Sequence, residues 1–166
     1  MMPRRSRSEL PDGPYHVTAR GTGGSLVFLD DVDRAAFTRL LSQASHRFGI
    51  RVLAWCLMGT HFHLIVECRQ EQLSLAMHRL SGIYAQTFNR RHGRRGHLFE
   101  ERFAAWVIES DAHLHAAIHY VMQNPVVAGL CRDSRDWMWS WPRLDEVAVW
   151  NGLFGREGLS LGPGEK

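Results

Sequence analysis

The sequence predicts an α+β fold: an antiparallel four-stranded sheet in the order βαββαβ, with two helices on one face and a further helix after the last strand. Three observations predict it, namely short stretches that alternate as strands do, longer stretches with helical apolar spacing and capping residues, and a tight turn between two apolar strands. With 166 residues, 45% of them hydrophobic, the chain is long enough for one globular domain with a normal core.

The first strand is followed by a helix. Tyr15–Arg20 alternates as a strand does and ends at a group of glycines. Asp30 or Asp31 can cap a helix that runs to about Phe48, and Gly49 can end it. The apolar residues of this helix fall on one face and are Phe37, Leu40, Leu41 and Ala44.

The middle of the chain predicts a hairpin and a second helix. The strands Arg51–Met58 and His61–Cys68 are joined by the tight turn Gly59-Thr60. A helix is expected from about Gln72 to Phe88. Its apolar residues in helical register are Leu73, Met77, Leu80 and Tyr84.

A fourth strand and a third helix complete the pattern. Phe103–Ile108 is rich in aromatic and branched residues, which favours a strand. Ser110 or Asp111 can cap the following helix. We expect this helix to end near Asn124, because Pro125 disfavours helical conformation in the residue before it.

The chain is mildly basic, with a formal net charge of +3, which permits a polyanionic partner. Much of the positive charge gathers in residues 89–97, which hold four arginines and no acidic residue. Two glycines interrupt this segment, so a flexible loop that follows a phosphate backbone is favoured over a helix face. The alternative is a solvated loop without a partner.

Composition also predicts the domain organisation and the compartment. Residues 1–13 are expected to be a flexible basic tail, residues 14–144 one domain and residues 145–166 a C-terminal tail. Three cysteines without a Cys-x-x-Cys pair indicate reduced thiols in a cytoplasmic protein. The longest apolar run, Val52–Met58, is too short to cross a bilayer, and no secretory signal is recognisable, so no membrane partner is expected.

Two histidines, His61 and His63, begin the third predicted strand. Alternate residues of a strand share a face, so both imidazoles point the same way and can hold one metal ion. In a helix the same spacing would separate them by about 200°. A purely structural role is the alternative.

Tyr120 and Asn124 are four residues apart and therefore share one face of the third predicted helix. A phenol can attack a phosphodiester, and an amide oxygen can complete the ligand set of a metal. A free phenol, with a pKa of about 10, is a weak nucleophile at neutral pH. A divalent ion at the phosphate would compensate by neutralising the developing charge. Alternatively, the tyrosine is a half-buried core residue and the asparagine ends the helix.

Other histidines of the third helix are weaker candidates. His113 lies seven residues before Tyr120, so it shares that face and could approach a substrate. His115 and His119 lie on a different face without an acidic or cysteine partner, and we expect them to be exposed.

Five stretches of the chain, within residues 14–142, match the motifs of one family in the family's order. They are Tyr15–Gly21, Leu57–Glu67, Tyr84–Gly93, Gly96–Phe103 and Tyr120–Leu130. Through them the chain resembles the REP-associated tyrosine transposases, which are single-tyrosine transposases of the IS200-like family with a His-hydrophobe-His metal motif.

The resemblance implies a ferredoxin-like fold and an enzyme that nicks single-stranded DNA near a REP-like hairpin through a 5′-phosphotyrosine intermediate. It implies His61, His63 and Asn124 as ligands of Mg²⁺ or Mn²⁺, and Tyr120 as the nucleophile. The protein is expected to be a monomer or a homodimer, with the tyrosine acting in its own site or in a partner's.

Two departures from the family pattern stand out. Gly59-Thr60 replaces the usual Pro-Asn before the first histidine, which alters the turn more than the chemistry. Glu100-Glu101 replaces the usual Gln-Gly and sets negative charge beside the basic segment.

Contacts to DNA are expected from basic side chains that can neutralise phosphates. The candidates are Arg90, Arg91, Arg94, Arg95, His97 and Arg102, together with Arg4, Arg5 and Arg7 of the tail. Phe99 and Phe103 can flank a bound strand. Three alternating tryptophans can either stack on bases or close the core, and these are Trp137, Trp139 and Trp141.

Two rival functions were weighed. A phosphoesterase with two His-x-Thr motifs is disfavoured, because His16-Val17-Thr18 has no second counterpart among the ten histidines. The other rival is a nucleic-acid-binding protein of the same fold without catalysis. The presence of the histidine pair, Tyr120 and Asn124 argues against it.

Overall fold

The computed structural model describes residues 10–142, so most of the two expected tails lies outside the described residues. The helices are α1 (Asp31–Phe48), α2 (Gln70–His92) and α3 (Asp111–Val127). The strands are β1 (Gly13–Arg20), β2 (Arg51–Leu57), β3 (His61–Cys68), β4 (Ala104–Val107) and β5 (Ser140–Trp141). None of the helices in this part of the chain has the length and apolarity that a bilayer crossing needs.

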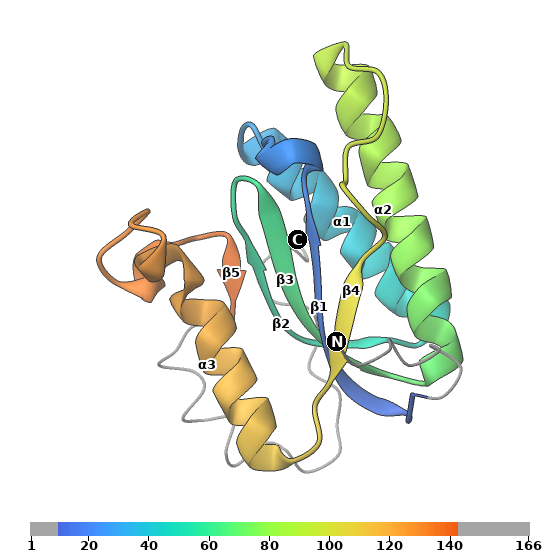
Figure 1. The fold of residues 1–166 in the computed structure, drawn as a ribbon, viewed down its shortest axis with the longest axis vertical. Coiled ribbons are helices and arrows are strands. Elements are labelled where there is room, and N and C mark those ends of the chain that lie inside the picture. Colours follow the sequence, from blue (N-terminus) through green and yellow to red (C-terminus); the bar gives the residue numbers. More distant parts are fainter. Residues whose placement is uncertain (1–9, 143–166) are drawn as a thin grey trace.

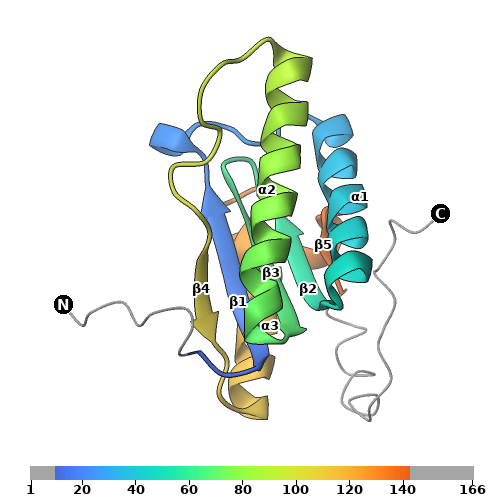
Figure 2. The ribbon, with the colours of Figure 1, turned by 90° about the vertical axis from the view of Figure 1, so that its right-hand side faces the viewer.

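The strands form one sheet in the order β4-β1-β3-β2-β5, and every neighbouring pair is antiparallel. Helices α1 and α2 cover one face of the sheet and α3 lies against the other (Figures 1 and 2). The predicted α+β class is therefore confirmed. The sheet has one strand more than predicted, because the two-residue β5 pairs with β2 and sets Trp141 opposite Trp55.

Helix α1 begins and ends at the predicted capping residues. The side chain of Asp30 accepts a hydrogen bond from the backbone N–H of Asp33, at 3.1 Å. At the other end Gly49 adopts the left-handed conformation, with φ of 63°, which glycine reaches without a steric penalty. Between α1, α2 and the sheet, aromatic rings form the centre of the core, with Phe37 4.7 Å from Phe62 between ring centroids.

Helix α2 is longer than predicted and continues through His92 rather than ending near Phe88. Residues 90–92 contain no helix-breaking residue, and the side chains of Arg91 and His92 both bind Asp33 of α1. This tertiary contact extends the helix, so Arg90 and Arg91 lie on a helix and not in the expected loop.

Helix α3 also passes its predicted end, because it includes Pro125 and stops at Val127. Pro125 has no N–H to donate to the carbonyl one turn before it, and the helix continues for only two residues beyond it. The carbonyls that follow are satisfied, since the N–H of Ala128 donates to Asn124 and that of Leu130 donates to Pro125, both at 2.9 Å. Pro125 itself is buried.

Strand register decides which side chains share the α3 face. His63 lies opposite Thr18 on β1, and His16 lies opposite Trp106 on β4. Residues that face each other across an antiparallel pair point to the same side of the sheet. Helix α3 packs over β2 and β3, so the histidines lie where the helix borders the β1 and β4 half of this face.

Candidate active site

The two histidines predicted as ligands start β3 and lie side by side. Their ring centroids are 5.0 Å apart. The side chain of His63 is 7% exposed, whereas His61 is half-buried. The hydroxyl of Thr60 lies 3.0 Å from Nδ1 of His61. A metal ion would therefore bind this ring through its other nitrogen, Nε2.

Helix α3 brings the predicted nucleophile to the same place. The ring of Tyr120 lies 5.9 Å from that of His63, edge to face, and its side chain is 58% exposed. The amide of Asn124, one turn later, donates from Nδ2 to the Tyr120 carbonyl at 2.9 Å, which leaves Oδ1 as an acceptor. One chain alone therefore gathers the four residues.

The site favours neutral imidazoles. Burial, with smaller contributions from the neighbouring His16 and His61, lowers the pKa of His63 to about 3, although the Asn124 amide acts in the opposite direction. Burial also lowers the pKa of His61, and Arg20 adds to this effect. A neutral imidazole keeps a lone pair that can bind a metal ion.

The residues fit a divalent metal ion. Nε2 of His63 is buried and has no hydrogen-bond partner among the described residues, which is costly for a polar atom unless a ligand satisfies it. Within residues 10–142 no three His, Cys, Asp or Glu side chains cluster as a metal site. The donors available here are the two imidazoles and the Asn124 amide. Such a set leaves coordination positions for phosphate oxygens, and it suits Mn²⁺ or Mg²⁺.

His16 was not among the predicted site residues, although it belongs to the His-x-Thr motif and to the Tyr15–Gly21 stretch. Nε2 of His16 lies 2.9 Å from Nδ1 of His63, and its ring is 5.9 Å from that of Tyr120. The alternation in β1 was a usable signal, since it sets His16 and Thr18 on one face. The pairing of β1 with β3 was the missing information, because it joins segments 47 residues apart.

A cavity of about 520 Å³ opens beside His63 and Tyr120. Its walls include His16, His63 and Tyr120, and the exposed indole of Trp106. Its charged lining consists of Arg20, Arg102, Glu100 and Glu101. A volume of this order is typical of ligand-binding clefts. Arg20 and Trp106 were not among the predicted site residues.

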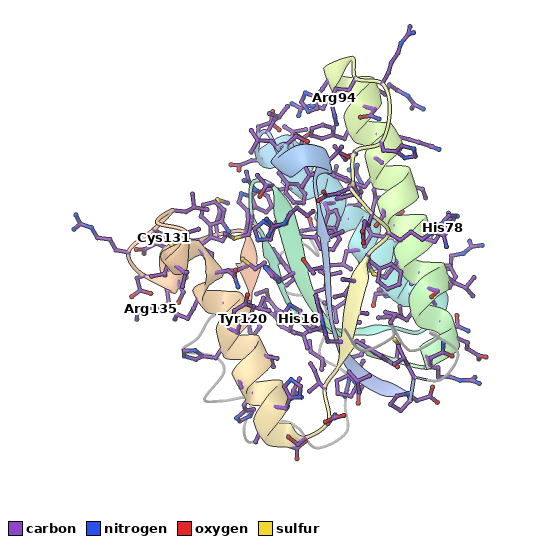
Figure 3. All side chains as sticks on the ribbon, viewed as in Figure 1. His16, His78, Arg94, Tyr120, Cys131 and Arg135 are labelled. Atoms are coloured by element: carbon purple, nitrogen blue, oxygen red, sulfur yellow. The ribbon has the colours of Figure 1, made fainter. Side chains whose placement is uncertain are left out.

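The predicted DNA-binding residues lie mostly away from this cavity. Figure 3 shows Arg94 at the far end of α2, whereas Tyr120 and His16 face each other between α3 and the sheet. The exposed members of the set are Arg90, Arg91, Arg95, His97 and Arg102, and Arg102 also lines the cavity. Arg94 is half-buried, with its guanidinium 6.0 Å from the centre of the Phe88 ring.

Arg91 has a different environment from the other predicted contacts. Its guanidinium donates to Asp30 and to Asp33, each at 2.7 Å. This ion pair joins the end of α2 to the start of α1. It occupies guanidinium N–H donors of Arg91 that a phosphate would otherwise bind.

Several aromatic side chains have structural roles. Phe99 is half-buried and packs against Phe62 and Tyr84, and Phe103 is buried. Both line a groove beside α2, and their contact with a DNA strand stays a prediction. The interpretation that the tryptophans close the core is supported at all three positions. The indoles of Trp137 and Trp139 donate to the Leu57 carbonyl and to Asp31, and Trp141 is buried.

The remaining histidines of α3 lie as predicted. His115 and His119 are exposed. His113 accepts a hydrogen bond from the backbone N–H of Glu109 at 3.3 Å, and its proximity helps burial to lower the pKa of His16.

The family model of the IS200-like transposases matches residues 13–124, a segment that contains both histidines of β3, Tyr120 and Asn124. The chain belongs to this family. This transposase is thus a DNA-processing enzyme by membership, and the matched segment ends at the asparagine of the candidate site.

Solved structures show the same fold for the transposase. A REP-associated tyrosine transposase bound to a REP hairpin has 17% sequence identity and a TM-score of 0.69, and the match covers 99% of this chain and 98% of that one. A proposed transposase from Deinococcus radiodurans R1 has 16% identity and a TM-score of 0.50, over 74% and 97% of the two chains. A search of curated proteins finds no match.

Proposed function

We propose that this transposase is a metal-dependent single-stranded DNA endonuclease and strand transferase, which nicks DNA near a hairpin through a 5′-phosphotyrosine intermediate. One observation carries the proposal: Tyr120 of α3 lies 5.9 Å, between ring centroids, from His63 of the histidine pair, beside an open cavity. A nucleophile, nitrogen ligands and room for a phosphate are thereby combined.

The chain's own residues account for the bond changes. The phenol oxygen of Tyr120 attacks the phosphorus of the scissile phosphodiester and releases its proton to water. The bond between phosphorus and the 3′ oxygen breaks, and that oxygen leaves as a 3′-hydroxyl after taking up a proton. The 5′ side remains on the tyrosine as a phosphodiester, so attack by another 3′-hydroxyl rejoins DNA without a nucleoside triphosphate.

His61, His63 and Asn124 would hold the divalent ion, Mg²⁺ or Mn²⁺. The ion would neutralise charge that develops on the phosphate and so compensate for the weak nucleophilicity of a phenol. Arg20 and Arg102 line the same cavity and can neutralise phosphates on either side of the scissile bond.

The proposed substrate is single-stranded DNA with a REP-like hairpin. The bound hairpin in the REP-associated relative supports this substrate, as do the exposed basic residues Arg90, Arg95 and His97 near the end of α2. A DNA that contacted both regions would place its hairpin at the end of α2 and its single strand at Tyr120. A monomer is sufficient for this chemistry, since Tyr120 approaches His63 of its own chain.

The test of the nucleophile is a covalent adduct. Hairpin-bearing single-stranded DNA is incubated with Mn²⁺ and wild-type protein, Tyr120→Phe or His119→Ala, and adducts are separated in denaturing detergent. We expect an adduct with the wild type and with His119→Ala, whose substituted side chain is an exposed neighbour on α3, and none with Tyr120→Phe. An equal adduct from Tyr120→Phe would refute the assignment.

The same assay separates the enzyme from a non-catalytic DNA-binding protein. If the wild type binds the hairpin in a gel-shift experiment but forms no adduct with Mn²⁺, the non-catalytic alternative is correct. Chelation by EDTA, or substitution of His61 and His63 by alanine, is expected to abolish the adduct and leave hairpin binding in place.

A further inference from the structure

We propose that His16 is a positioning residue that fixes the orientation and the tautomer of His63, by accepting a hydrogen bond from its Nδ1–H, and thereby keeps Nε2 of His63 unprotonated for the metal. This inference rests on the proposed function, which assigns His63 as a metal ligand. The observation that supports it is the 2.9 Å distance between Nε2 of His16 and Nδ1 of His63.

A hydrogen bond between the two rings needs one proton, and the nitrogen that carries this proton decides whether Nε2 of His63 can bind a metal. If Nδ1 of His63 carries the proton, Nε2 has the lone pair that a metal needs. If Nε2 of His16 carries it, Nδ1 of His63 is the acceptor, and a neutral His63 must then hold its proton on Nε2. The second arrangement would block metal binding through that nitrogen.

The surroundings of His63 favour the first arrangement. Its Nε2 is buried and makes no hydrogen bond to a described residue. A nearby acceptor, the Asn124 amide, is itself a proposed ligand of the ion, so a proton on Nε2 would compete with the metal for it. A lone pair on the same nitrogen is satisfied once the metal binds. Ligating histidines commonly use their second nitrogen as a donor to a neighbouring acceptor, and loss of that neighbour lowers metal affinity about 10–100-fold.

His16 is a neighbour of the ligands and not a third imidazole ligand. Its Nε2 is directed at the ring of His63. Among the described residues, no three His, Cys, Asp or Glu side chains are arranged to share one ion, although His16, His61 and His63 belong to adjacent strands. The ring of His16 is also fixed by packing, with Trp106 5.6 Å and Tyr120 5.9 Å away between centroids.

Two substitutions separate the hydrogen bond from the shape of the ring. His16→Gln can place an amide oxygen where Nε2 lies and so keeps an acceptor for His63. His16→Phe keeps a planar ring against Trp106 and Tyr120 but has no acceptor. Mn²⁺ affinity is measured by titration calorimetry for both variants, for the wild type and for His63→Ala.

We expect His16→Phe to bind Mn²⁺ about 10–100-fold more weakly than the wild type and His16→Gln to stay within a few-fold. Wild-type affinity in His16→Phe would overturn the inference, and so would equal losses in both variants. If the wild type itself does not bind Mn²⁺, or if His63→Ala binds as the wild type does, the metal site of the proposed function fails instead.

A second measurement does not need the metal. Nitrogen-15 NMR of the imidazole rings in the metal-free protein reports which nitrogen of His63 is protonated. We expect protonated Nδ1 in the wild type and in His16→Gln, and a shift of the proton to Nε2 in His16→Phe. A wild-type His63 protonated on Nε2 would overturn the role of His16, whatever the metal data show.

Discussion

The indole ring of Trp106 lies 5.6 Å from the imidazole ring of His16, and the two residues face each other across β4 and β1. Trp106 is 54% exposed, although it borders the cavity that contains Tyr120. An exposed indole beside the proposed phosphate site offers a flat surface on which a nucleobase can stack. We therefore expect Trp106 to contribute to DNA binding next to the residues of the proposed chemistry.

Trp106→Ala should weaken the binding of single-stranded DNA by about 1–3 kcal/mol, which corresponds to roughly 5- to 150-fold in affinity. Trp106→Phe retains an aromatic face and should lose much less. Fluorescence anisotropy with a labelled oligonucleotide measures both. Because the residue is on an edge strand and largely exposed, the unfolding midpoint of the alanine variant should stay close to that of the wild type, and unaltered DNA affinity in that variant would contradict the stacking role.

Replacement of Glu100 and Glu101 by glutamine should strengthen DNA binding. Both carboxylates line the cavity of Tyr120 and also a larger groove of about 850 Å³ beside α2. Removing each exposed charge is expected to raise affinity about 1.5- to 5-fold, since such charge interactions are worth about 0.2–1 kcal/mol.

The control for these two substitutions is Glu71→Gln, which makes the same change of charge at the start of α2, away from both cavities. The gain in affinity should shrink as salt screens the charges. A gain of equal size in Glu71→Gln would mean that net charge, and not the place of these two residues, sets the affinity.

Asp33→Ala should lower the free energy of unfolding by about 2 kcal/mol. Asp33 is 2% exposed and accepts hydrogen bonds from Arg91, from His92 and from the backbone N–H of Leu29. The loss is smaller than for a fully buried pair, because Arg91 is 36% exposed and keeps Asp30 as a partner. Urea denaturation measures the change, and Asp33→Asn, which keeps the shape, should be less destabilising.

Acid should weaken the junction between α1 and α2 through Asp30. The hydrogen bonds from Arg91 and from the backbone of Asp33 lower the pKa of Asp30 from its ordinary 3.8 to about 2. A carboxyl group with a lowered pKa contributes stability that is fully present above pH 3.8 and is lost as the pH falls toward 2. Asp30→Asn retains a helix cap but does not titrate, so its stability should change less across this interval in pH-dependent thermal melts. Identical pH profiles would contradict this role.

Local sequence rules predicted the elements whose signals are local. The hairpin strand His61–Cys68 begins and ends where the alternation and the turn predicted, and α1 begins and ends at its predicted caps. The lengths of α2 and α3 were wrong for a physical reason: Asp33 binds the last turn of α2 from another helix, and backbone donors after Val127 satisfy the carbonyls of the last turn of α3. The spacing of apolar residues along the chain does not predict such contacts between distant residues.

In the candidate site, too, local patterns predicted the residues that share one element, and contacts between elements were not predicted by them. His61 and His63 share a face because they belong to one strand, and Tyr120 and Asn124 because they belong to one helix. The approach of that helix to the strand followed only from the family resemblance. His16, Arg20 and Trp106 reach the site through the pairing of β1 with β3 and β4, which no local pattern reveals.

The two faces of the sheet have different roles. On the side of α1 and α2 the aromatic core fixes the fold, whereas Tyr120, His61 and Asn124 remain exposed or half-buried on the other side. Substitutions at these three positions therefore remove little apolar packing. Under the proposed function, a copy of this gene that lost Tyr120 by a single mutation would still produce a folded protein with its arginines in position, and that protein could occupy a hairpin and exclude active copies from it.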